Sequence, residues 1–159
     1  MTSVCGRSLT SQVCADSVLI LHLVCVGGTF ETLPKLVHAT LEEYRTAESL
    51  LYEEVIFDFG TRRKLAAWTK KAAQLGAKLA ARNFGRKIIF VTVHSEMRRG
   101  DLFAGKDENE KDFMNFLFSA PLDELVFAST LYMLACGHVV EFEESFTALK
   151  QSIVRLSPE

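Results

Sequence analysis

The run VLILHLVCV at residues 18–26 is almost continuously apolar, and it decides the fold class. Similar short runs follow it, namely EVIFDF at 54–59, KIIFVTV at 87–93 and TLYMLAC at 130–136. Strands buried on both faces of a parallel sheet have this composition, because neither of their faces meets water. The sequence therefore predicts a mainly parallel sheet of about four strands.

Helical patterns separate the predicted strands, as the crossover connections of a parallel sheet require. Apolar residues recur every three or four positions over residues 37–51, 65–79 and 142–156. Pro34 near the start of the first pattern and Gly85 beyond the second mark helix limits. The predicted fold class is α/β, a three-layer α/β/α sandwich with helices on both faces of the sheet.

The chain has 159 residues and 48% hydrophobic content, which is enough for one domain to bury its own core. No repeat or linker interrupts it, so we interpret residues 1–159 as a single domain. A sheet of four strands that finishes on a helix is small. A further strand beyond the C-terminus is therefore an open alternative.

The segment SVLILHLVCVGG at residues 17–28 also resembles the apolar core of a secretory signal. It contains His22, however, only Arg7 precedes it as a positive charge, and no clear cleavage site follows. It is also shorter than the roughly 20 apolar residues of a membrane-spanning helix. We interpret it as a buried strand and expect no association with a membrane.

The cysteines and histidines show no metal-binding pattern. No CxxC pair occurs among the four cysteines, and the four histidines do not fall at zinc-ligand spacings. We therefore expect no structural metal. Unpaired thiols of this kind are typical of a reducing compartment, so we expect a cytoplasmic location.

The basic residues are concentrated in the middle of the chain. Residues 61–99 hold eleven Lys or Arg and one acidic residue, although the net charge of the chain is −2. No aromatic residues alternate with these bases to stack on nucleotides, so nucleic acid is not the expected partner. Two interpretations stay open, the solvated face of a helix and, over residues 62–87, a surface for a protein partner.

Two of the predicted strands end at side chains that can react. KIIFVTV is followed by His94, and TLYMLAC ends at Cys136. Reactive groups collect beyond the carboxyl ends of parallel strands, and neighbouring strands lie roughly 5 Å apart. If these two strands are neighbours, His94 is placed to accept the proton of the Cys136 thiol, which is then a nucleophile. The alternative is a buried, structural Cys136.

Further residues near the strand ends complete the candidate site. Gly137 permits a sharp turn after the cysteine, so the backbone N–H groups of Ser95 and Gly137 are the expected donors to an oxyanion. His138 is a second candidate base, although it follows the cysteine closely. Asp58, at the end of the second strand, is a candidate for binding a basic side chain of a substrate.

The turn VGGTFET at residues 26–32 gives a different functional alternative. It joins a predicted strand to a predicted helix and contains two glycines, so its N–H groups at residues 27–29 are candidates for binding a phosphate or a nucleotide. It lacks a Walker lysine and the full GxGxxG spacing. A tight turn without a ligand is the simpler interpretation.

The segment IIFVTVHSE with the following RRGDLFAG, and LYMLACG further along the chain, resemble the His and Cys motifs of caspase-like cysteine peptidases. The chain is most similar to the CHAT-type domains of that clan, over about residues 50–155. The resemblance implies that His94 is the base and Cys136 the nucleophile in cleavage of a protein or peptide substrate, without cofactor or metal. Ser95 stands where the family usually has glycine, so a catalytically inactive protein-interaction domain is the alternative.

Overall fold

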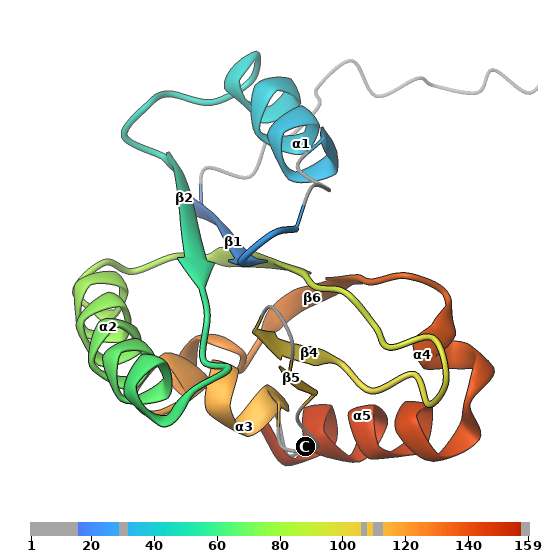
Figure 1. Cartoon of the computed structure of the whole chain (residues 1–159). Helices are drawn as coiled ribbons and strands as arrows, with labels where there is room; N and C mark the ends of the chain where they lie inside the picture. The colour runs from blue at the N-terminus through green and yellow to red at the C-terminus, as the bar shows by residue number, and fades with distance from the viewer. Residues whose placement is uncertain (1–15, 29–31, 106–107, 110–112, 157–159) are drawn as a thin grey trace, which may run out of the picture.

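The main sheet contains four parallel strands in the order β2-β1-β3-β6 (Figure 1). The computed structural model of the chain describes residues 16–28, 32–105, 108–109 and 113–156. The predicted parallel sheet is confirmed, and the two strands that precede His94 and Cys136 are neighbours. The strands are β1 (Val18–Cys25), β2 (Leu50–Phe57), β3 (Arg86–Thr92) and β6 (Ser129–Leu134).

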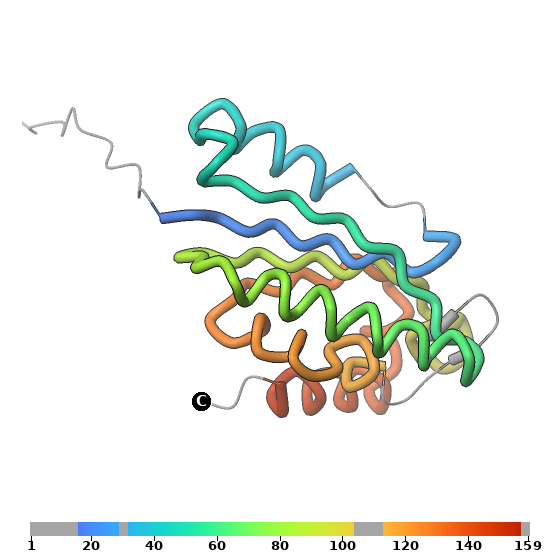
Figure 2. Tube along the Cα trace, turned by 90° about the vertical axis from the view of Figure 1, so that its left-hand side faces the viewer, coloured from blue at the N-terminus to red at the C-terminus, as the bar shows by residue number. Residues whose placement is uncertain are grey.

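Helices cover both faces of this sheet, which confirms the predicted three-layer sandwich. One face carries α1 (Thr32–Glu42), and the other carries α2 (Arg62–Ala80), α3 (Phe113–Leu117) and α5 (Glu143–Leu156) (Figure 1). The strands and α1 run as separate layers in the view of Figure 2. Two short elements, the 3-10 helix η1 (Leu122–Leu125) and α4 (His138–Glu141), flank β6 in the chain.

The central strand β1 explains the continuous apolar run at the start of the chain. All eight of its residues are buried, because β2 and β3 pair with its two edges and helices cover its faces. Leu19 and Leu21 belong to the large core on the α2 side, whereas Val18 and Ile20 belong to a smaller core under α1. In the described residues, no helix combines the length and apolarity needed to cross a membrane.

The first helix and the second strand differ from the sequence-based expectation. The helix ends at Glu42 instead of continuing to residue 51, and Tyr44 beyond it is 70% exposed. Hydrogen bonds from Ser49 N and Leu50 N to the Thr46 carbonyl form a turn. β2 then begins at Leu50, four residues earlier than expected, because Leu50 pairs with the first residue of β1.

The chain between β3 and α3 contains a small hairpin. Its antiparallel strands are β4 (Phe103–Gly105) and β5 (Glu108–Asn109), and Ser95 forms an isolated bridge with Leu102. Strands this short leave no alternating pattern in the sequence, since several alternations are needed to recognise one. The hairpin lies beside the carboxyl ends of the main strands (Figure 1).

Candidate active site

The register of β3 and β6 determines how His94 and Cys136 are placed relative to each other. The strands pair with a constant offset of 42, from Lys87 opposite Ser129 to Thr92 opposite Leu134. β3 ends one residue and β6 two residues earlier than the sequence suggested, but a hydrogen bond of 3.1 Å from Val93 N to the Leu134 carbonyl continues the pairing. His94 and Cys136 have the same offset of 42, because 136 − 94 equals 134 − 92. They therefore take corresponding positions beyond the two strand ends.

A second contact keeps the two segments together beyond the strands. The Ser95 hydroxyl donates a hydrogen bond of 3.1 Å to the Cys136 carbonyl. Ser95 itself is buried, at 6% exposure, between this contact and its bridge to Leu102. The backbones that carry His94 and Cys136 are thus joined on both sides of the His94 position.

The half-buried His94 ring lies between the turn after β1 and the hairpin. Its Nε2 atom is 3.4 Å from the Gly27 carbonyl oxygen, and its ring meets the Phe103 ring edge-on at 6.4 Å between centroids. Gly27, two residues beyond β1, has φ +82°, a left-handed conformation that favours glycine. In the tautomer with a proton on Nε2, that proton is donated to Gly27 and the lone pair is on Nδ1.

The two cysteines that the structure describes have different environments. Cys25 is buried, and its thiol lies 3.8 Å from the Phe103 carbonyl. Burial first, and the charge of Asp58 second, raise the pKa of Cys25 to about 11, so its thiol stays protonated and unreactive at neutral pH. Cys136 is only partly buried. Cys136 is therefore the candidate nucleophile of the two.

The direction of the backbone amides favours Ser95 as an oxyanion donor. Val93 N donates toward β6, whereas Glu96 N donates in the other direction, to the Asp101 carbonyl at 2.8 Å. Successive amides of an extended chain alternate in direction, so Ser95 N–H faces the same side as Val93 N–H, toward Cys136.

Gly137 does not form the sharp, glycine-dependent turn that the sequence suggested. Its backbone has φ −59° and ψ −17°, an ordinary helical conformation open to any residue, and it begins the single turn of α4. An added Cβ at Gly137 would meet no atom within 4 Å. Its N–H group remains a candidate donor by its position next to Cys136, but not because of a special turn.

Asp58 and His138 each pair with a charged side chain outside the strand-end pair. Asp58 follows β2, three strand spacings from β6, or roughly 14 Å. Its carboxylate pairs with the Lys64 ammonium at 2.6 Å. The His138 ring lies 3.0 Å from the Glu141 carboxylate within its own helical turn. Neither residue takes part in the site proposed below.

The glycines of the turn after β1 make contacts within the protein. Gly28 N donates a hydrogen bond of 2.8 Å to the Cys25 carbonyl, so this amide is not available to an anion. The Gly27 carbonyl, as described above, faces His94. Residue 29, the last of the three in the phosphate-binding alternative, lies outside the described residues.

Three of the six basic residues of α2 connect the helix to β2 or to Asp58, which follows β2. The Lys64 ammonium pairs with Asp58, Lys78 pairs with Glu53 at 2.8 Å, and Lys71 donates to the Ile56 carbonyl at 3.1 Å. The helix is therefore more than a solvated face. Its exposed cations Arg62, Arg63 and Lys70 take no part in these contacts.

A polar cluster around the buried His22, under α1, was missed from the sequence. His22 is fully buried in β1, with Nε2 2.8 Å from the Thr92 hydroxyl and Nδ1 3.3 Å from both the Glu54 carboxylate and the Tyr52 hydroxyl. The hydrogen bond from Tyr52, followed by the charges of Lys35 and His22, lowers the pKa of Glu54 against the effect of burial. The sequence feature that could have indicated this cluster is His22 itself, a polar residue within an apolar run.

This cluster connects three strands close to the candidate site. Glu54 is in β2, His22 in β1 and Thr92 at the end of β3, two residues before His94. His22 and Thr92 are buried, whereas Tyr52 is half-buried and Glu54 is exposed. Buried hydrogen bonds such as that between His22 and Thr92 rigidify the elements that they join. The cluster therefore holds the strand end from which His94 projects.

Comparison with known proteins gives no family for the chain. No protein-family model matches it, and no curated protein matches it significantly. Within the described ranges, no group of three or more His, Cys, Asp or Glu residues is placed to hold a metal ion. The function must be inferred from the geometry of the strand ends.

Proposed function

We propose that the chain is a CHAT-like, caspase-like cysteine peptidase domain, with Cys136 as the nucleophile and His94 as the base. The observation that carries this proposal is the common register of the two residues at one edge of the sheet. The hydrogen bond between Ser95 and the Cys136 carbonyl and the partial exposure of Cys136 support it. The substrate class is a protein or a peptide.

In the proposed reaction, His94 Nδ1 accepts the proton of the Cys136 thiol, and the Gly27 carbonyl stabilises the imidazolium that forms. The thiolate attacks the peptide carbonyl carbon, and a C–S bond forms as the carbonyl oxygen gains negative charge. The N–H groups of Ser95 and Gly137 donate to that oxygen. The C–N bond then breaks, His94 protonates the departing amine, and water hydrolyses the thioester to release the acid and restore the thiol.

A peptide with an electrophilic chloromethyl ketone tests this function on the full chain. We expect it to label wild type and Cys25→Ala at Cys136, as read by mass spectrometry of tryptic peptides. Cys136→Ala should lose this adduct, and His94→Ala should form it at least about tenfold more slowly, because general base catalysis contributes about 10²–10⁴-fold. Equal labelling of wild type and Cys136→Ala would sink the proposal.

A catalytically inactive interaction domain of the same fold is the second candidate. The exposed cations Arg62, Arg63 and Lys70 on α2 favour it, because they take no part in the contacts of the other α2 lysines with β2 and Asp58. The labelling experiment separates the two candidates. A folded wild-type chain whose Cys136 reacts no faster than in His94→Ala would favour the interaction domain.

A further inference from the structure

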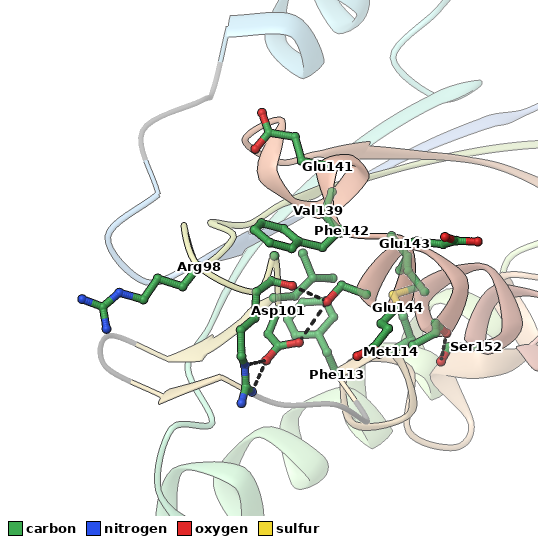
Figure 3. Close-up of a pocket in the computed structure, with 16 residues that line it drawn as sticks. Arg98, Asp101, Phe113, Met114, Val139, Glu141, Phe142, Glu143, Glu144 and Ser152 are labelled. Carbon is green, nitrogen blue, oxygen red and sulfur yellow. Dashed lines mark hydrogen bonds and ion pairs between the residues drawn. The ribbon is translucent and has the colours of Figure 1, made fainter.

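A cavity of about 500 Å³ lies next to the candidate active site and is separate from it (Figure 3). Its walls come from the turn at residues 98–102, from α3, and from the chain at residues 139–152 in α4 and α5. Neither His94 nor Cys136 lines it. Its volume is within the range of small-molecule binding sites, about 300–1,000 Å³.

The interior of the cavity is mostly apolar. Phe113 and Met114 of α3 are 2% exposed, and Leu102 and Val139 are 6% exposed. Phe142 lies across the top of the cavity in Figure 3. An apolar body would lose its contact with water here, which is favourable by about 25 cal/mol for each Å² buried.

The negative charge of Asp101, a carboxylate within the cavity, is already balanced by neighbouring groups. The Asp101 side chain is 13% exposed, and it accepts hydrogen bonds from the Arg99 guanidinium and, at 3.1 Å, from the Ser145 hydroxyl. Ser145 is in the first turn of α5, whose N-terminal dipole also favours a negative charge. Asp101 therefore contributes little net charge to a ligand.

The mouth of the cavity is acidic. Glu141, Glu143 and Glu144 line it together with the cation Arg98, and of the three glutamates Glu141 is within 3.0 Å of the His138 ring. The Glu141, Glu143 and Arg98 side chains extend away from the apolar interior in Figure 3. If the apolar part of a ligand lies inside the cavity, its other end lies at this mouth. The acidic mouth attracts a positively charged end group and repels a negatively charged one.

We propose that this cavity binds a hydrophobic amine, with the apolar body inside and the protonated amine at the acidic mouth. The apolar walls select the body, and the carboxylates at the mouth, chiefly Glu143 and Glu144, select the charge of its end. The site goes beyond the proposed peptidase function, because it uses none of the residues of the strand-end pair.

The cavity is lined both by the segment that follows His94 in the chain and by the segment that follows Cys136. Residues 98–102 follow His94, and Val139 and Phe142 follow Cys136. The segments are in close contact, since a Cβ added at Gly100 would lie 2.6 Å from the His138 carbonyl oxygen. A bound amine would therefore contact both segments at once.

Three ligands that share a phenyl group on a four-carbon chain, and that differ in the end group, test the proposal on the full chain. They are 4-phenylbutylamine, 4-phenylbutanol and 4-phenylbutyrate, with binding followed by calorimetry and by amide chemical shifts. We expect the amine to bind about fivefold or more tightly than the alcohol, since one exposed charge interaction contributes about 1 kcal/mol. The carboxylate should bind most weakly, and salt should reduce the preference for the amine.

Two sets of variants assign the binding to this cavity. The pair Glu143→Gln and Glu144→Gln should bring the affinity for the amine close to that for the alcohol. The matched pair Glu43→Gln and Glu48→Gln, which lies away from the cavity, should not. Ala148→Trp should fill the cavity and abolish binding of all three ligands, with thermal unfolding confirming that the variant is folded.

Three results would overturn the proposal. The first is the absence of saturable binding by the amine. The second is a carboxylate that binds as tightly as the amine. The third is unchanged binding to folded Ala148→Trp. Each is independent of whether an electrophilic peptide labels Cys136, so failure of this site and failure of the peptidase function are distinguishable.

Discussion

At the scale of single residues, the environment of each thiol separates a structural cysteine from a candidate nucleophile. Cys25 is enclosed by the core, and burial together with Asp58 raises its pKa to about 11. Cys136 is partly exposed at the sheet edge, beside the Ser95 contact. The apolar sequences around the two cysteines look alike, so the difference could not be predicted without knowing which strand is central.

The raised pKa of Cys25 predicts a pH dependence of stability. The folded state prefers the neutral thiol more than the unfolded state does, since the pKa rises from 9.0 to about 11 on folding. This contribution is present below pH 9.0 and is lost as the pH rises toward about 11. The free energy of unfolding, measured with urea between these pH values, should fall more steeply for wild type than for Cys25→Ala. Parallel curves would contradict the prediction.

The hydroxyl of Thr92 should stabilise the fold through His22. Thr92→Val keeps the side-chain shape but removes the 2.8 Å hydrogen bond to His22 Nε2 inside the protein. Loss of a buried partner costs about 1–3 kcal/mol, so the urea midpoint should fall accordingly. Thr69→Val, on the exposed face of α2, is the matched control and should change stability by less than about 0.5 kcal/mol. Equal effects would argue against the cluster around His22.

At the scale of elements, hydrophobic patterns predicted the strands well and the first helix less well. The continuous run at residues 18–26 predicted β1, because burial on both faces removes polar positions. Leu51 fell on a helical period by chance and extended the predicted α1, although it belongs to β2. The His22 cluster could not be predicted, since its partners come from three strands whose order the sequence does not state.

The contact of α2 with η1 predicts an unusual effect of a helix substitution. Gly76 is inside α2, toward its C-terminal end, where replacing glycine by alanine normally stabilises a helix by about 1 kcal/mol. A Cβ at this position would lie 2.9 Å from Leu122 N and 3.0 Å from atoms of Pro121. Since backbone cannot move aside easily, Gly76→Ala should instead lower stability by about 1–3 kcal/mol.

Thermal unfolding of Gly76→Ala and of Ala77→Gly checks this prediction. Ala77 is the exposed neighbour of Gly76 in the same helix, so Ala77→Gly should show only the intrinsic propensity cost of about 1 kcal/mol. A Gly76→Ala variant more stable than wild type would mean that α2 and η1 are not in close contact.

At the scale of the whole molecule, the parallel sheet brings together residues that are far apart in the chain. His94 and Cys136 are separated by 42 positions, yet the register of β3 and β6 places them at one edge of the sheet. The sequence predicted the two strand ends, but the adjacency of the strands came from the structure. The same edge carries α4 and the turn at residues 98–102, which form part of the separate cavity (Figure 3).

The most direct test of this arrangement is a disulfide between the two strand-end positions. His94→Cys should form a disulfide with Cys136 under mild oxidation, because corresponding residues of paired strands lie roughly 5 Å apart at Cα, within the range that a disulfide spans. Met97→Cys, at a position that is 73% exposed beyond the pairing, is the control and should cross-link much more slowly. Peptide mapping by mass spectrometry identifies the linked pair. A His94→Cys variant that cross-links no faster than Met97→Cys would contradict the account.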